Sequence, residues 1–233
     1  MSSEAVRKAL QKKSGPKKAQ DSHRFFKTGP GQYSEGDVFI GVTVPEIRKI
    51  VSQYSAISLS EIKKLLQSRI HEERLAALFL LTARYRSSDE KGRKQIFDFY
   101  RTHLRHVNNW DLVDCSAHYI VGPYLEKKDR SLLSKLAGSR NLWERRVAII
   151  ATFHYIRQGN PEETFRISKM LLSDPHDLIH KAVGWMLRET GKHGPQGALE
   201  GFLEAHSGRM PRTMLRYAIE RFPERKRKAY LNR

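Results

Sequence analysis

Residues 108–114 (NNWDLVD) bring one indole and two carboxylates together within a single predicted helix. Asp111 lies in the first turn, where a carboxylate suits the helix dipole, and one of the two preceding asparagines can cap the helix. Asp114 lies one turn beyond Trp110, on the same face. A carboxylate held there can stabilise positive charge or orient water, and an indole face attracts cations. Asp114 and Trp110 are therefore the first candidates for chemistry.

The elements that must position these residues are helices. A helix is expected from about Val44, because Thr43 and Glu46 form a capping box and Pro45 lies in the first turn. No period-2 strand pattern is found, and residues 29–41 form one long loop. The pattern therefore predicts an all-α fold. Further helices are expected at about 58–67, 71–86, 89–106, 110–121, 130–138, 142–157, 162–173, 176–190, 196–205 and 210–221.

Basic residues recur near the start of the second helix of each predicted pair. They are Arg74, Arg146, Lys181 and Arg216, and with Trp110 midway between the first two the steps are 36, 36, 35 and 35 residues. Such a period is typical of antiparallel helix pairs stacked as a solenoid. Residues in equivalent phase then line one concave surface. We therefore predict a helical-repeat solenoid with a concave basic groove, in which Asp114 is the exceptional negative charge.

The charge of the whole chain points to a polyanionic partner. The 233 residues include 43 Lys+Arg and 25 Asp+Glu, a formal charge of +18, which favours nucleic acid. Hydrophobic residues make up 39%, enough to bury a core. We expect a monomer with one domain over residues 1–222, followed by a solvated basic tail at 223–233.

Composition also excludes several classes of protein. No apolar run approaches the ~18 residues of a membrane span, and the basic, polar N-terminus has no signal-peptide core. The single cysteine, Cys115, can form neither an internal disulfide nor a zinc–thiolate site. A cytoplasmic protein is therefore expected.

Each candidate residue also has a purely structural interpretation. The cations can be solvated helix faces. Trp110 and Trp185 can belong to the core, as Trp143 is expected to do. Asp114 can form a salt bridge to Arg145 or Arg146, an alternative that the spacing leaves open.

Five segments in this order resemble the AlkD-type DNA alkylation-repair glycosylases, which are built of HEAT-like repeats. They are FFKTGPGQY (25–33), FIGVTVPEIRK (39–49), WDLVD (110–114), ERRVAII (144–150) and KAVGWMLRE (181–189). The resemblance covers roughly residues 20–222. It implies an all-helical HEAT-like solenoid that holds duplex DNA in its concave face. The implied activity is hydrolysis of the N-glycosidic bond of cationic N3- and N7-alkylated purines, without cofactor or metal and with the lesion kept in the duplex.

The resemblance also implies roles for individual residues. Asp114 matches the catalytic aspartate, and Trp110 and Trp185 match aromatic residues that pack on the deoxyribose of the lesion. Arg146 matches a cleft arginine that contacts the DNA backbone. The remaining predicted DNA contacts are Thr43 and Arg48, Lys181 and Arg216 from the repeat phase, His154 where a cleft lysine would be expected, and Phe25 where some relatives have tyrosine.

Two other functions stay open. One is a noncatalytic HEAT-like protein that binds damaged or branched DNA. The other is a HEAT-type protein scaffold, which predicts weak salt dependence of binding. The joint presence of Trp110, Asp114, Arg146 and Trp185 favours catalysis.

Overall fold

The structure, a computed structural model, describes residues 1–232. The regular secondary structure of these residues is helical, and their only strand-like feature is an isolated bridge between Val38 and Ile70. The predicted all-α class is therefore confirmed. The chain forms two compact units, Met1–Ser116 and a second that begins at Ala117. Among the described residues, no helix is both long and apolar enough to cross a membrane.

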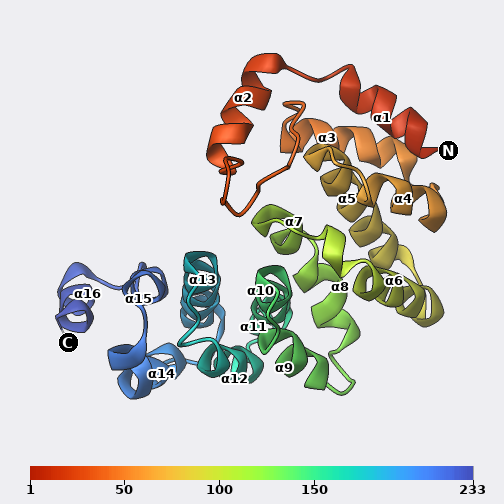
Figure 1. The fold of residues 1–233 in the computed structure, drawn as a ribbon. Helices are drawn as coiled ribbons and strands as arrows, with labels where there is room; N and C mark the ends of the chain where they lie inside the picture. The colour runs from red at the N-terminus through yellow and green to blue at the C-terminus, as the bar shows by residue number, and fades with distance from the viewer. Residues whose placement is uncertain (233) are drawn as a thin grey trace. The chain divides into compact units, whose positions relative to one another are not determined.

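The first unit is built around one buried helix, α5 (Figure 1). All of its residues from His71 to Thr82 are buried, because α1, α3, α4, α6 and α7 pack on it. The helices are α1 (Ser3–Gln11), α2 (Pro16–Phe25), α3 (Val44–Val51), α4 (Leu59–Leu66), α5 (His71–Ser87), α6 (Glu90–Thr102) and α7 (Trp110–Asp114), with 3-10 turns at Ser52–Tyr54 and Leu104–His106.

The second unit repeats a helix pair. In Figure 1, α9, α12 and α14 lie along one edge of this unit, and α10, α13 and α15 lie along the other. Helix α9 packs on α10 and α12 on α13, and α13 also packs against both α10 and α15, so helix pairs stack here as the 35-residue period predicts. The helices are α8 (Ala117–Tyr124), α9 (Ser131–Ala137), α10 (Leu142–Ala151), α11 (Phe153–Ile156), α12 (Glu162–Met170), α13 (Asp177–His193), α14 (Ala198–His206), α15 (Arg212–Ala218) and α16 (Glu224–Leu231), with a 3-10 turn at Ser207–Arg209.

Two helices expected to be continuous are interrupted by hydroxyl side chains. The segment expected at 110–121 breaks between α7 and α8, where Ser116 Oγ donates to the Leu112 carbonyl at 2.6 Å. The segment expected at 142–157 breaks at Thr152, whose Oγ1 donates to the Ile149 carbonyl at 2.7 Å. A hydroxyl that binds a carbonyl in the preceding turn competes with the helical ladder. As a result α7 ends at Asp114.

Three helices were not expected from the sequence: α1, α2 and α16. In α1 the buried residues Val6 and Leu10 lie one turn apart, and Ser2 Oγ caps the helix by accepting from the Ala5 N–H at 3.3 Å. In α16 the buried side chain is Tyr230. The segment expected as a solvated tail is thus a helix over Glu224–Leu231, while residue 233 of that segment lies outside the described residues.

Candidate functional site

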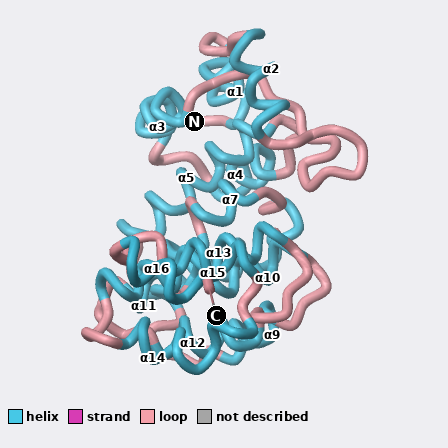
Figure 2. The backbone as a smooth tube through the Cα atoms, turned by 90° about the vertical axis from the view of Figure 1, so that its left-hand side faces the viewer, coloured by secondary structure: helices cyan, strands magenta, loops and turns pink. Residues whose placement is uncertain are grey.

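Trp110 and Asp114 are the first and last residues of α7, so the short helix carries both candidates for chemistry. Its N-cap is the fully buried Asn109, whose Oδ1 accepts from the Trp110 N–H at 2.8 Å. Asn109 Nδ2 donates to Ser34 Oγ at 2.5 Å and to Asp37 Oδ2 at 3.1 Å. The long loop between α2 and α3, visible in Figure 2, therefore holds the beginning of α7.

A buried charge cluster joins this loop to α5 and α7. Asp37 accepts a hydrogen bond from Arg74 Nη2 at 2.6 Å, and its other oxygen lies 3.2 Å from His71 Nδ1. His71 Nε2 lies 2.8 Å from Asp111 Oδ2. Because both ring nitrogens face carboxylate oxygens, which only accept when ionised, the geometry favours a doubly protonated imidazolium. His71 and Arg74 then balance the charges of Asp37 and Asp111.

The pKa values within the cluster agree with this charge state. Burial opposes the charged form of His71, but the carboxylates of Asp111 and Asp37 outweigh it and raise the pKa of His71 to about 9. Burial likewise opposes ionisation of Asp37, but His71, Arg74 and Asn109 outweigh it and lower the pKa of Asp37. His71 and Asp37 are therefore both charged near neutral pH.

An aromatic stack from the same loop supports the half-buried Trp110. The Phe26 ring stacks 5.3 Å from Trp110 and 4.8 Å from Phe39, measured between ring centroids. Phe39 in turn stacks on His71 at 4.5 Å. Phe25 approaches the edge of Trp110 at 5.8 Å and is 65% exposed. The charge cluster and the aromatic stack thus share His71 and both end at α7.

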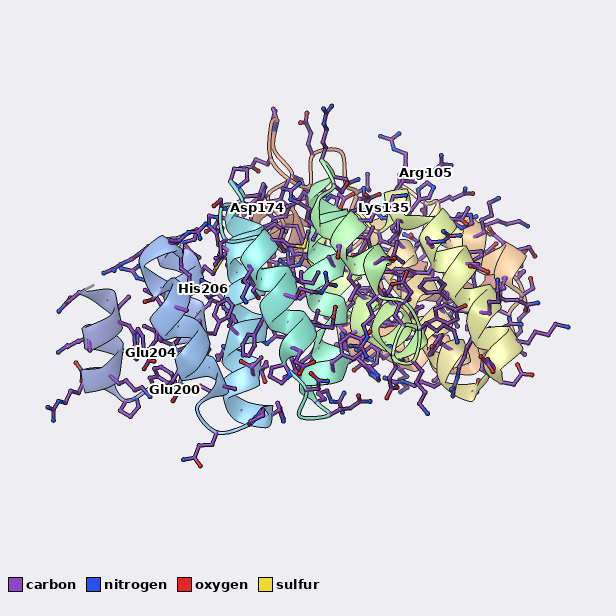
Figure 3. The ribbon with its side chains drawn as sticks, turned by 90° about the horizontal axis from the view of Figure 1, so that it is seen from below. Arg105, Lys135, Asp174, Glu200, Glu204 and His206 are labelled. Atoms are coloured by element: carbon purple, nitrogen blue, oxygen red, sulfur yellow. The ribbon has the colours of Figure 1, made fainter. Side chains whose placement is uncertain are left out.

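The two carboxylates of α7 have different surroundings. Asp111 Oδ1 accepts from the Leu112 N–H at 2.9 Å while Oδ2 faces His71, so its structural interpretation is supported by direct contacts. Asp114 is half-buried at the other end of α7. Arg145, one of the two salt-bridge partners considered for Asp114, binds Asp174 at 2.6 Å. Asp174 is labelled in Figure 3.

The expectation that Arg74 lines a phosphate-binding surface is wrong. Arg74 is 3% exposed, and its guanidinium donates to Asp37 and to the carbonyls of Ser68 and Arg69. Arg146 in the second unit is similarly enclosed, at 5% exposed, with Nη1 donating to the Leu178 carbonyl at 2.6 Å. The repeat phase did not reveal how deeply Arg74 and Arg146 are buried.

The other predicted contacts of the second unit are more accessible. Lys181 Nζ pairs with Asp177 at 2.8 Å, one turn earlier on α13, and Arg216 is exposed on α15. Trp185 follows Lys181 by one turn and is half-buried, with its ring 5.9 Å from that of Phe153. The roles of these residues in DNA binding stay predictions.

His154 belongs to a polar cluster on the second unit. Its Nε2 lies 3.1 Å from Glu126 Oε2, and Gln158 Nε2 donates to Glu126 Oε1 at 3.0 Å. The pKa of Glu126 is lowered, chiefly by its hydrogen bond with His154. A DNA phosphate at His154 would therefore have to compete with the Glu126 carboxylate.

Thr43 is the N-cap of α3, and Arg48 lies within this helix. The capping box is confirmed, since Glu46 Oε2 accepts from the Thr43 N–H at 3.0 Å and from its hydroxyl at 2.6 Å. These hydrogen bonds lower the pKa of Glu46. Arg48 is exposed, and its Cζ lies 4.1 Å above the centroid of the Phe79 ring. Thr43 thus has a clear structural role, and both residues stay predicted phosphate contacts.

Sequence reasoning missed the residues that hold α7 from outside it: Phe26, Asp37, Phe39 and His71. Phe26 and Phe39 lie within the segments that carry the family resemblance, so they could have been singled out. Asp37 and His71 lie outside those segments. Their contacts with α7 span 72 residues in the case of Asp37 and 40 in the case of His71, so no local pattern marks them.

Comparisons with known proteins agree with this fold. The model of a family described as "DNA alkylation repair enzyme" matches residues 6–222. No curated protein matches the chain. Among solved structures, one described as a predicted DNA alkylation repair enzyme from Enterococcus faecalis is similar, with a TM-score of 0.70 and 19% sequence identity. The match covers 91% of this chain and 98% of that chain, and it supports the helical-repeat fold.

Proposed function

The chain belongs to the DNA alkylation repair enzyme family, and we propose that it is a DNA glycosylase that removes cationic N3- and N7-alkylated purines from duplex DNA. The observation that carries this proposal is α7, which holds an indole, Trp110, and a carboxylate, Asp114, at its two ends. The formal charge of +18 supports DNA as the partner.

The proposed reaction needs only one carboxylate. The bond between C1′ and the purine nitrogen breaks, and its electron pair leaves with the base, which becomes neutral because the alkylated purine was a cation. The positive charge passes to the sugar, which becomes oxocarbenium-like. The Asp114 carboxylate stabilises this charge and orients the attacking water, whose proton passes to Asp114 or to solvent. Since the departing base needs no proton, no general acid is required.

The aromatic and basic residues are proposed to hold the substrate. The indole of Trp110, supported by Phe26, would pack on the sugar and add cation–π attraction for its developing charge. Trp185 is proposed as a second residue that packs on the sugar. Proposed contacts to the DNA backbone are Phe25, Thr43, Arg48, Arg146, His154, Lys181 and Arg216.

Base release from a defined lesion tests the proposal. The protein is incubated with duplex DNA that contains a single 7-methylguanine, and the freed base is quantified. We expect release by the wild type and loss of release in Asp114→Asn. The matched control is Asp98→Asn, which changes an accessible carboxylate on α6 that pairs with Lys94, and it should retain activity.

Two outcomes would contradict the proposal. If the wild type binds DNA but releases no base, the glycosylase function is wrong and a DNA-binding protein without catalysis is the better description. If Asp114→Asn releases base at the wild-type rate, the function can stand but the assignment of the catalytic carboxylate is wrong.

A further inference from the structure

We propose that His71 is a positioning residue for base excision, which fixes α7 through its ion pair with Asp111 and thereby sets where Trp110 and Asp114 lie. The inference rests on the proposed function. It concerns a residue on α5 that touches neither the sugar nor the base in that proposal. The inference is based on the 2.8 Å contact between Nε2 of His71, the first residue of α5, and Oδ2 of Asp111, the second residue of α7.

The helix that carries the two proposed reaction residues cannot orient itself. It has five residues, and isolated helices of this length are not stable in water because nucleation is costly. Its direction must therefore come from contacts with the rest of the first unit. Asn109 holds its beginning through the loop, and the ion pair between Asp111 and His71 ties it to α5.

His71 is well placed to act as a rigid anchor. It begins a 17-residue helix whose first twelve residues are all buried, and its own side chain is 2% exposed. Its ring lies 4.5 Å from Phe39 and 4.9 Å from Phe26, centroid to centroid. Turning the ring would break its contacts with both Asp37 and Asp111, so the imidazolium has one favourable orientation.

The same ring also supports Trp110 by a second route. Phe26 packs against both His71 and Trp110. His71 thus reaches the first residue of α7 through Phe26 and the second through Asp111. Losing the imidazolium would loosen both contacts and leave the Asp111 carboxylate without its partner. A displacement of about 1 Å between reacting groups can cost up to ~100-fold in rate.

Single-turnover excision separates positioning from binding and folding. The variant His71→Gln is compared with the wild type on 7-methylguanine duplex at saturating protein, and its affinity is measured on the same duplex without the lesion. We expect the rate constant to fall by roughly 10- to 100-fold while the dissociation constant changes by less than about 3-fold. The double variant His71→Gln/Asp111→Asn should lose little more rate than His71→Gln alone, because both substitutions remove the same contact between α5 and α7.

The matched control loses a different, partly buried ion pair on the same helix. Glu73 is two residues after His71, its side chain is 6% exposed, and it accepts from Arg7 Nε at 2.9 Å. The contacts of Glu73 tie α5 to α1 rather than to α7. Glu73→Gln should therefore lower the stability of the first unit while the excision rate constant of the folded protein stays at the wild-type value.

Several results would overturn the inference. The inference is wrong if folded His71→Gln has the wild-type rate constant. It is also wrong if Glu73→Gln loses as much of the rate as His71→Gln does. If His71→Gln does not fold, Asp111→Asn tests the same contact from a side chain that is 16% exposed. Wild-type protein that releases no base would overturn the proposed function and this inference together, whereas active wild type with active variants overturns the inference alone.

Discussion

Raising the pH should destabilise the first unit through His71. The pKa of this residue is raised from an ordinary 6.5 to about 9, because the carboxylates of Asp111 and Asp37 overcome the effect of burial and of the neighbouring Arg74. In the unfolded chain the imidazole loses its proton above about pH 6.5, whereas the folded protein keeps it until about pH 9. The stabilisation is therefore complete below about pH 6.5 and disappears as the pH rises to about 9.

The size of the effect follows from the shift in pKa. Each unit corresponds to about 1.4 kcal/mol, so the shift of His71 amounts to roughly 3 kcal/mol of unfolding free energy. Because the residue is almost completely enclosed, solvent screens it little. Between about pH 7 and pH 8.5 the free energy of unfolding should fall by about 2 kcal/mol.

This pH window separates His71 from the other groups whose pKa is shifted. Burial lowers the pKa of His106, His176 and His206, so their effect lies below about pH 6.5 and has the opposite sign. Burial raises the pKa of Cys115 well above its usual value, which adds a loss of stability only above about pH 8.5. Cys115→Ser removes that contribution.

Urea unfolding at several pH values provides the assay. Because the chain forms two units, Trp110 fluorescence is followed in a Trp143→Phe/Trp185→Phe background, so that the signal reports the first unit. His71→Gln in the same background should be less stable near neutral pH and almost insensitive to pH over this window. A wild-type curve parallel to that of His71→Gln would refute the doubly protonated imidazolium and the charge balance derived from it.

Three further predictions concern other contacts. Glu72→Ala should lower the free energy of unfolding by about 3 kcal/mol or more in urea, because the buried carboxylate accepts from the backbone N–H groups of residues 40–42. Arg216→Ala should reduce the slope of log K for DNA against log salt by about 1, measured by anisotropy at several salt concentrations. Glu126→Gln should tighten DNA binding by about two- to five-fold near neutral pH, since it frees His154 from a partly exposed ion pair.

The repeated helices of the second unit could be predicted because their apolar residues recur at helical spacing. The helices α10, α13 and α15 each begin within five residues of the cation that marks the period: Arg146, Lys181 and Arg216. In α1 and α16 the burial signal is much sparser. Only Ser3, Val6 and Leu10 are buried in α1 and only Tyr230 in α16, so the abundant charge hides the apolar face.

The placement of the two proposed reaction residues on one helix could be predicted, but the contacts that support this helix could not. Trp110 and Asp114 share one short segment, so their spacing on a helix is a local property. The contacts of His71 depend on tertiary folding, which brings an aspartate from the loop and another from α7 to the same ring. Arg74 failed as a predicted groove residue for the same reason, since Asp37 approaches it from 37 residues away.

The two carboxylates of α7 differ in their contacts, so we expect their substitutions to have different effects. The position of Asp111 in the first turn of α7 was explained from the sequence by the helix dipole alone. In the structure its Oδ2 pairs with His71, and the two cations His71 and Arg74 balance the two anions Asp37 and Asp111. Asp111 therefore adds no net charge beside a bound phosphate, and its variants should act on geometry. Asp114 lies at the opposite end of the helix from the cap. If Asp114 is the proposed reacting carboxylate, substituting it should remove base release while leaving α7 in place. Substituting Asp111 should instead displace α7 while leaving the Asp114 carboxylate present.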